Sequence, residues 1–349
     1  RLGVLGRLMT AGGPEITKIT FYSPHGRSVS VPSKWLGPVN ALSLSRAEMD
    51  FHLLDRAREV GATVLEDAKV KGLIIAGGKV RGVLLEHDGQ ISEYRSDLTI
   101  DATGRARALS RKHSTSLGRK SNNSRRHGPL VAFKAHFKEK LVQANGCEIY
   151  FYPGGYGGLS QVEDNMSNLC FIVPAEEVQA CAGNPEELMH HYVLSNFRAS
   201  EMLRDRRAES SWLSVSIDAF GRNDLIATNG LIAIGDAASF IDPFTGSGIL
   251  MALESGELAA EVILRWLPAL KAGACFSELA AEYRARYLKT FSSRLRVCKW
   301  LRHLIFAPGP VIEATILTFG FSERLLQSLA SLTRHVPDLH RRPIERDAH

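Results

Sequence analysis

The chain has 349 residues, of which 44% are hydrophobic and 23% charged, and its formal net charge at pH 7 is +6. This composition excludes a fibrous or disordered protein, and the length allows two domains or one large discontinuous domain with buried cores. The five cysteines are odd in number and contain no C-x-x-C pair. A disulfide framework is therefore disfavoured, and a cytoplasmic location fits best.

The first half of the chain alternates short strand patterns with one clear helix. Strands are predicted at 16–21 and 27–31, joined by a turn at Ser23-Pro24-His25-Gly26. Ser45 with Glu48 forms a capping box that predicts the start of a helix ending at Gly61. The strands that follow form a predicted β-meander and one further strand that ends at an aspartate: 70–75, 79–86, 91–94 and 98–100.

The second half contains further strands before it becomes helical. We expect strands at 130–137, 147–152, 168–173 and 231–234, and helices at 185–198 and 246–267. From Phe276 onward the pattern is helical, with a break at 307–310. The predicted strands form groups that differ in hydrophobic periodicity and are separated along the chain by other segments. This pattern predicts an α/β fold in which a discontinuous domain receives an inserted antiparallel sheet.

The segment from Leu231 to Gly248 carries the strongest chemical signal. Four apolar residues in a row predict a strand buried on both faces, and Asp236 follows at its carboxyl end, where open α/β sheets bind ligands. A carboxylate there can accept hydrogen bonds from sugar-like hydroxyl groups. Gly246 and Gly248 bracket a predicted helix start, whose free N–H groups favour negative charge. The alternative is a plain strand-loop-helix unit in which Asp236 caps a turn.

Three islands of this sequence resemble the p-hydroxybenzoate hydroxylase-like flavoproteins, in the branch of geranylgeranyl reductases and flavin-dependent halogenases. The segments 235–238, 242–243 and 246–248 are similar to the second FAD-binding motif of that superfamily. Ser45-Arg46 and the segment 101–105 resemble its two phosphate-proximal segments, in the same chain order. The resemblance implies FAD as the cofactor, bound by Arg46, Asp101, Gly104, Gly235, Asp236, Ala237, Pro243, Gly246, Ser247 and Gly248.

The resemblance also implies a domain organisation. We expect a three-layer FAD-binding domain from 43–112 and 216–268, a substrate domain from 14–40 and 113–215, and a helical region at 269–349. No strand followed by G-x-G-x-x-G and a helix occurs in the sequence, so the amino-terminal adenine-binding βαβ unit of the superfamily is expected to be missing.

The strand at 147–152 is the predicted wall of a substrate pocket. Glu148, Tyr150 and Tyr152 share one face of it, and a glycine-rich turn containing Gly155 follows. The alternative is a half-buried strand with partly solvated tyrosines. By resemblance, geranylgeranyl reductases carry Y-x-W-x-F-P here and halogenases W-x-W-x-I-P. This chain keeps Pro153 but has neither tryptophan, which argues against a halogenase.

The expected function is that of an FAD-dependent oxidoreductase, geranylgeranyl reductase-like, that uses NAD(P)H to reduce a hydrophobic lipid, polyene or aromatic substrate. One alternative is a flavin monooxygenase of an aromatic or polyketide-like substrate, and another is a truncated product that no longer binds FAD. The residues single out no catalytic base and no metal site, which is acceptable because the flavin itself carries the redox chemistry.

The basic residues gather between Arg284 and Arg302, where seven Lys or Arg occur without an acid. We weigh two interpretations: a solvated helix face packed on the body of the protein, which is the commoner case, and a peripheral membrane contact through 284–306. The apolar stretch 304–321 does not predict a membrane span, because Pro308, Pro310 and Glu313 interrupt it. No nucleic-acid motif accompanies the charge, and the sequence leaves the oligomeric state open.

Overall fold

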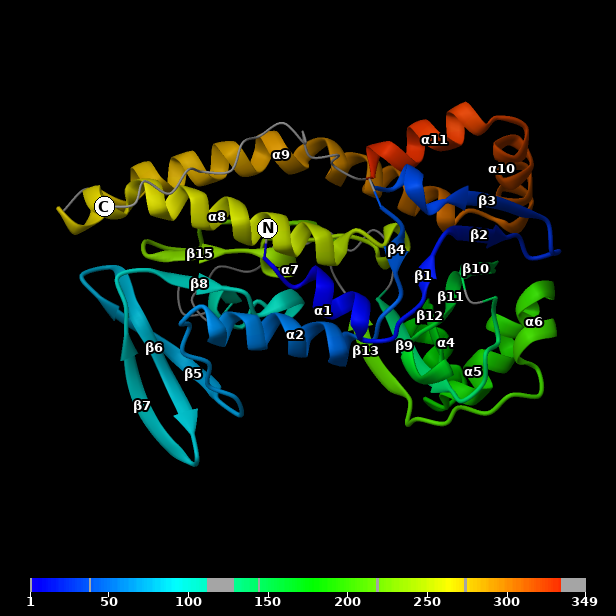
Figure 1. Cartoon of the computed structure of the whole chain (residues 1–349), viewed down its shortest axis with the longest axis horizontal. Helices are drawn as coiled ribbons and strands as arrows, with labels where there is room; N and C mark the ends of the chain where they lie inside the picture. Colours follow the sequence, from blue (N-terminus) through cyan, green and yellow to red (C-terminus); the bar gives the residue numbers. More distant parts are fainter. Residues whose placement is uncertain are drawn as a thin grey trace.

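A computed structural model describes residues 2–37, 39–111, 129–143, 145–217, 220–272 and 275–333. Figure 1 shows a seven-stranded sheet at one end of the molecule and a three-stranded meander at the other, with two long helices, α8 and α9, running side by side along the length. The α/β class predicted from the sequence is confirmed.

The large sheet has the strand order β13-β9-β12-β11-β10-β2-β3. All neighbours in it are antiparallel except β10 and β2, which pair in parallel, with Glu148 opposite Thr20. Its strands are β2 (Lys18–Tyr22), β3 (Ser28–Pro32), β9 (Leu130–Phe137), β10 (Gly146–Tyr152), β11 (Gly155–Gln161), β12 (Ser167–Pro174) and β13 (Leu213–Ile217).

The two faces of this sheet are covered differently. One face packs against short helices through Tyr150, Leu188 and Leu203. The other packs against the carboxyl-terminal helices through Phe151, Ile305 and others. The short helices are α4 (Ala175–Ala180), α5 (Pro185–His191), η4 (Val193–Ser195) and α6 (Phe197–Leu203).

The single helix predicted at 185–198 is wrong, because the chain there forms α5, η4 and α6 instead. Asn196 causes the last break. Its buried side chain accepts a hydrogen bond from the N–H of Ala199 and so begins α6. Its amide also donates to the carbonyl oxygens of Tyr22, Ser23 and Phe151, which fixes the break against the sheet.

The second half of the molecule is built on the parallel pair β8 (Thr99–Asp101) and β15 (Leu231–Ala233). Helix α8 (Gly248–Lys271) covers this pair and α9 (Phe276–Ile305) covers α8, with Val262, Leu279 and Phe291 fully buried between them. The Tyr283 hydroxyl on α9 donates a 2.8 Å hydrogen bond to the carbonyl of Ala233, which ties the outer helix to the strand.

The smaller elements are distributed over both halves of the molecule. They are α1 (Leu5–Thr10), β1 (Glu15–Ile16), η1 (Ser33–Trp35), β4 (Ala41–Leu42), α2 (Arg46–Glu59), the meander β5 (Lys69–Ala76), β6 (Lys79–His87) and β7 (Gln90–Arg95), then η2 (Gly104–Ala106), η3 (Glu163–Asn165), β14 (Gly221–Arg222), α7 (Gly235–Ala238), β16 (Ser239–Phe240) and η5 (Pro243–Thr245).

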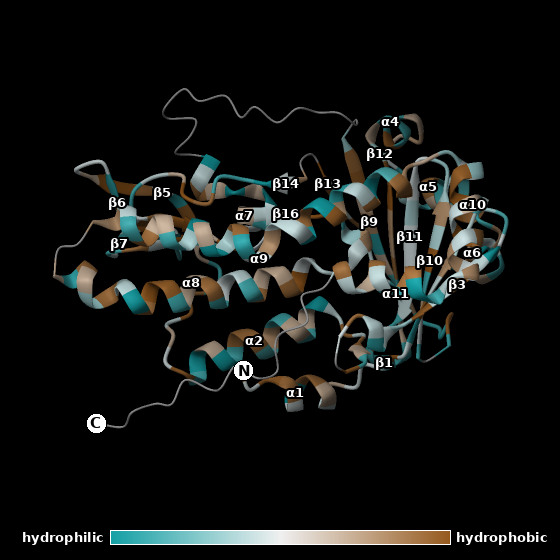
Figure 2. Ribbon diagram, turned by 90° about the horizontal axis from the view of Figure 1, so that it is seen from above, coloured by the Kyte–Doolittle hydropathy of each residue, from teal (hydrophilic) through white to brown (hydrophobic). Residues whose placement is uncertain are grey.

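The chain then returns to the large sheet through α10 (Gly309–Phe321) and α11 (Glu323–Leu332), both of which contact β3. Figures 1 and 2 both place these helices at the end of the molecule that holds β2 and β3. Within the described ranges, no helix is long and apolar enough to cross a membrane. The predicted boundary near residue 113 and the last part of the predicted helical region lie outside those ranges.

Candidate functional site

Asp236 lies directly after β15, in the short helix α7. Gly235 before it has a φ of +57°, and an added Cβ would lie 3.3 Å from the Cβ of Ala252 on α8, so glycine is required there on both conformational and steric grounds. The N–H of Gly235 donates a 2.8 Å hydrogen bond to the Ser255 hydroxyl. These contacts fix the backbone that presents Asp236.

The Asp236 carboxylate is half-buried and makes no hydrogen bond to any residue in the described part of the chain. Burial raises its pKa, and the positive charges of Arg105 and Arg46 act against that rise. Since both guanidinium groups influence the carboxylate, all three sequence islands converge here. A half-buried acid without a protein partner has the chemistry expected of a group that receives hydroxyl donors from a ligand.

The Asp101 carboxylate differs from that of Asp236, because both of its oxygens already accept hydrogen bonds from the protein. It is completely buried, and its two oxygens accept hydrogen bonds from the backbone and hydroxyl groups of Thr103 and of Ser110. These bonds hold the turn that contains Gly104, whose φ is +66°. Asp101 therefore positions the loop that carries Arg105.

The two arginines reach the site from different elements. Arg46 is the first residue of α2, after the Ser45 cap, and forms an exposed ion pair with Asp50 at 2.8 Å. Arg105 donates a 2.9 Å hydrogen bond to the carbonyl of Ser216, and its guanidinium lies 5.1 Å from the centre of the Phe240 ring.

The loop between β16 and α8 is held by its own side chains. Pro243 begins η5, and Gly246 ends it in the left-handed region with φ +58°. Ser247 is fully buried, and its hydroxyl donates to the carbonyls of Thr245 and Thr333, so it ties the loop to the end of α11. No side chain caps the start of α8 at Gly248, which leaves its first N–H groups without a side-chain acceptor.

A buried network beneath this loop escaped the sequence reasoning. The Asp242 carboxylate, 2% exposed, accepts hydrogen bonds from the Tyr156 hydroxyl and from the backbone N–H of Phe244, and it forms an ion pair with Arg302. The Arg302 guanidinium also lies 3.6 Å from the centre of the Phe220 ring. The network joins β11, η5 and α9. The sequence did contain one indication of this network. Arg302 lies in the segment Trp300–Phe306, whose other residues are apolar except His303.

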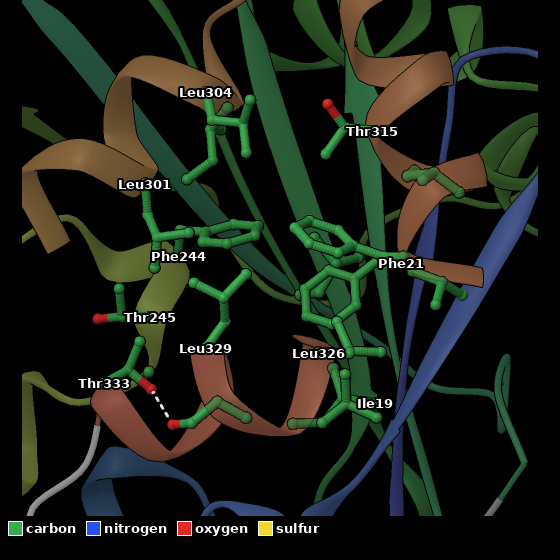
Figure 3. Close-up of a pocket in the computed structure, with 18 of the residues that line it drawn as sticks. Ile19, Phe21, Phe244, Thr245, Leu301, Leu304, Thr315, Leu326, Leu329 and Thr333 are labelled. Carbon is green, nitrogen blue, oxygen red and sulfur yellow. Dashed lines mark hydrogen bonds between the residues drawn. The ribbon is translucent and has the colours of Figure 1, made fainter. Parts of the chain in front are cut away.

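An almost uncharged cavity of about 280 Å3 adjoins the same loop. Figure 3 shows Phe21 and Phe244 near its centre, with leucines of α9 and α11 around them. The rings of Phe21 and Phe151 lie 5.5 and 5.6 Å from that of Phe244. Phe319 is a fourth aromatic residue of the lining, and the polar side chains in it are those of Cys147, Thr245, Thr315 and Thr333. Burial raises the pKa of the Cys147 thiol to about 12, so this group stays neutral.

The predicted pocket residues of β10 do not line this cavity. The cavity side of the strand carries Cys147, Ile149 and Phe151, and the alternation of side chains places Glu148, Tyr150 and Tyr152 on the opposite side. There the Tyr150 hydroxyl donates to Glu148, which is paired with Arg198 at 2.9 Å.

The other two predicted positions serve packing as well. The Tyr152 hydroxyl donates to the carbonyls of Tyr156 and Ile172. Gly155 allows close strand approach, since a Cβ on it would lie 2.0 Å from the carbonyl oxygen of Ile172. For the cavity described here, the expected pocket face is thus corrected to the neighbouring face of the same strand. The error arose because a row of two tyrosines and a carboxylate was interpreted as a ligand surface, although these groups satisfy one another and the backbone.

The basic stretch 284–302 is largely paired with the body of the protein. Four of its seven cations form ion pairs with acids of other segments: Arg284 with Asp224, Arg286 with Glu261, Arg294 with Glu254 and Arg302 with Asp242. The interpretation as a helix face packed on the body accounts for these four residues.

Comparison with known proteins gives a consistent result. No family model matches the chain. It is 25% identical over 322 residues to digeranylgeranylglycerophospholipid reductase 1 of Methanococcoides burtonii, covering 90% of this chain and 71% of that protein. The solved structure of a geranylgeranyl bacteriochlorophyll reductase-like protein from Thermoplasma acidophilum superimposes with a TM-score of 0.74 at 20% identity, covering 92% of this chain and 80% of the other. The flavin-dependent brominase Bmp2 gives a TM-score of 0.76 at 19% identity over 94% and 79% of the two chains.

In sequence and fold the chain is similar to FAD-dependent oxidoreductases of the group that includes geranylgeranyl reductases and flavin-dependent halogenases, as its sequence islands predicted. These similarities support an FAD-dependent oxidoreductase of the geranylgeranyl reductase-like kind.

Proposed function

We propose that this protein uses FAD and NAD(P)H to reduce carbon–carbon double bonds of a hydrophobic substrate of the lipid or polyene type. The observation that carries the proposal is the apolar cavity, which is bounded by Pro243, Phe244 and Gly246 of the loop assigned to the flavin. An uncharged wall of this kind favours a hydrocarbon chain over a polar metabolite. The reductase names of the relatives in sequence and structure support the same substrate class.

The residues around Asp236 fit FAD. Its carboxylate lacks a hydrogen-bond partner among the described residues and would accept hydrogen bonds from the ribityl hydroxyls, while the neighbouring Ala237 is buried in the core. The uncapped N–H groups at the start of α8 would offset negative charge on the ring. Arg46 and Arg105 supply positive charge for the phosphates. FAD supplies hydride transfer when bound, and the chain's own groups bind, orient and exclude water.

We also propose the domain division derived from the sequence. The strands of the seven-stranded sheet fall within the proposed substrate domain, 14–40 and 113–215, except that β13 ends two residues beyond it at Ile217. The parallel pair β8 and β15 falls within the proposed flavin domain, 43–112 and 216–268, and α9 falls within the helical region that begins at 269. This distribution supports a substrate domain inserted into a flavin domain. The described cysteines are free thiols, which supports a reducing compartment such as the cytoplasm.

The test is a spectrum followed by a turnover assay. Protein expressed from its complete reading frame should release FAD on denaturation. Under anaerobic conditions it should oxidise NADH or NADPH only when a prenyl-chain lipid with double bonds is added, and mass spectrometry should find the product heavier by two hydrogen atoms per bond reduced. Colourless protein would refute the flavin assignment, and flavin without reduction of the lipid would refute the substrate assignment.

A flavin monooxygenase is the second candidate. Three of the four phenylalanine rings at the cavity, Phe21, Phe151 and Phe244, form a surface on which a flat aromatic substrate can pack. This function predicts that NAD(P)H oxidation requires both an aromatic substrate and oxygen, and that the product gains one oxygen atom. The anaerobic assay therefore separates the two candidates.

Ile149→Trp is expected to raise KM for the hydrophobic substrate about tenfold, because the larger side chain fills part of the cavity at a cost of about 1–3 kcal/mol. Tyr150→Phe is the matched control on the other face of the same strand. It should leave KM unchanged and lower the free energy of unfolding by about 1 kcal/mol, since Glu148 loses a buried donor. Flavin content should be unaffected in both variants. Equal KM effects would place the substrate elsewhere.

A further inference from the structure

Helix α10 is apolar on two sides. Its inner side lines the cavity with Ile312, Ile316 and Phe319. Its outer side exposes Val311, Leu317 and Phe321, which are 44%, 40% and 88% exposed. Thr318 is also exposed on this outer side, and its hydroxyl donates to the carbonyl of Ala314 within the helix. A helix with large apolar side chains on two sides normally lies between two apolar partners. The described part of the chain supplies the inner partner only.

The one charged residue among the 13 of α10 is used toward the protein. The Glu313 side chain is 15% exposed, and it accepts hydrogen bonds from the backbone N–H and the ring of His25 in the turn before β3. No charge is therefore left on the outer side of the helix. A surface helix in contact with water alone would be expected to carry polar residues there.

Helix α11 continues this apolar surface. Leu325 and Leu332 are 46% and 52% exposed and lie seven residues apart, so they share one face of the helix. Leu326 and Leu329, which line the cavity, lie beside these two residues on the helix, so Leu325 and Leu332 stand at the edge of the cavity wall. We call the exposed side chains Val311, Leu317, Phe321, Leu325 and Leu332 the hairpin surface.

Cations stand near the hairpin surface. Arg324 is exposed on α11, and Lys34 is exposed on η1, which contacts α11. Arg27, 56% exposed at its side chain, is the ion-pair partner of Glu313 at 3.8 Å, so Arg324 and Lys34 are the cations that carry this argument. Glu323 is the exposed acid of the hairpin. Exposed apolar side chains with basic neighbours are typical of surfaces that bind anionic bilayers, where the apolar groups enter the boundary region and the cations meet lipid phosphates.

From these features we infer that the hairpin surface docks on an anionic lipid bilayer. This inference rests on the proposed function, because a lipid substrate must leave a bilayer to reach the cavity. The inner sides of α10 and α11 form a wall of the cavity, so docking through the outer side of α10 and the exposed leucines of α11 holds the cavity against the membrane. The contact lies at 311–332, and differs from the basic stretch 284–306 considered from the sequence, whose cations are largely paired with acids.

The experiment is flotation of the full protein with vesicles of phosphatidylcholine containing phosphatidylglycerol. The parent protein should float with the vesicles, and the triple variant Leu317→Ser, Phe321→Ser, Leu325→Ser should bind at least tenfold more weakly, because three apolar side chains no longer enter the lipid. The matched control is Leu264→Ser with Ile91→Ser, at positions 67% and 61% exposed on α8 and β7. This control should bind as the parent does.

Two flotation results would overturn the inference: a parent protein that stays with the buffer, or a triple variant that floats like the parent. Sedimentation of the same variants can give a further contrary result. If the substitutions dissociate a dimer and vesicles never bind, the surface is an interface between two copies. Flavin content and anaerobic reduction of a short, detergent-dispersed substrate are measured in parallel, and should be equal in the parent and the triple variant. If the parent protein floats with the vesicles but does not reduce the substrate, the proposed function is refuted and the docking of the hairpin surface on the bilayer is not.

Discussion

Replacing Arg302 by methionine is expected to lower the free energy of unfolding by about 3–5 kcal/mol, because the change leaves Asp242 as an unpaired buried charge. Asp242 is 2% exposed, and its remaining partners are the Tyr156 hydroxyl and the N–H of Phe244. The variant also removes the cation from the face of the Phe220 ring. Chemical unfolding followed by circular dichroism measures the change.

The design of this experiment isolates the buried pair. The double variant Asp242→Asn, Arg302→Met should be more stable than Arg302→Met alone, since neither partner is then charged. Arg95→Met removes an exposed ion pair with Glu93 and should change the free energy of unfolding by less than about 1 kcal/mol. An Arg302→Met effect no larger than that of Arg95→Met would show that Arg302 and Asp242 are not paired in the protein.

Arg302 is also expected to act on the flavin through the loop 243–246. Because Asp242 fixes the start of η5, loss of its partner should loosen the loop and weaken FAD binding. Arg302→Lys keeps the charge but loses the planar contact with Phe220, so it should restore part of the stability and of the flavin content. Equal flavin affinity in the parent and in folded Arg302→Met would limit the network to a structural role.

Asp236→Ala is expected to weaken FAD binding about ten- to a hundredfold. The half-buried carboxylate would lose its hydrogen bonds to cofactor hydroxyls, and bonds to charged groups contribute about 1.5–3 kcal/mol each. Titration of flavin-free protein with FAD, followed by quenching of flavin fluorescence, measures the affinity. The unfolding of the flavin-free protein should be almost unchanged, because the carboxylate has no hydrogen-bond partner among the described residues.

The matched control for this prediction is Asp97→Ala, a substitution of the same type at a side chain that is 90% exposed near β8. It should leave FAD affinity unaltered. If Asp236→Ala binds FAD as tightly as Asp97→Ala does, Asp236 is not a cofactor ligand and the second flavin motif has been assigned wrongly.

The sequence by itself determined the class of the protein and the position of its central elements. Four apolar residues before Gly235-Asp236 and a Ser-Glu capping box before Arg46 are local signals, so the strand β15 and the start of α2 follow from neighbouring residues alone. The order of the three islands along the chain was enough to predict the resemblance that the comparisons support. The side chains assigned to the cofactor stay a prediction that Asp236→Ala tests.

Only the tertiary structure decided which face of β10 borders the cavity and which cation holds the loop. When a strand carries large side chains on both faces, its local sequence does not show which face borders a cavity. The face of β10 with Tyr150 is covered by α5 and α6, and Arg198 of α6 pairs with Glu148 on that face. Arg302 meets Asp242 across 60 residues of sequence. The outer side of α10 likewise carries no charge because Glu313 contacts His25, which is 288 residues away in the sequence. Such contacts depend on how distant segments pack, and a pattern within one segment cannot encode them.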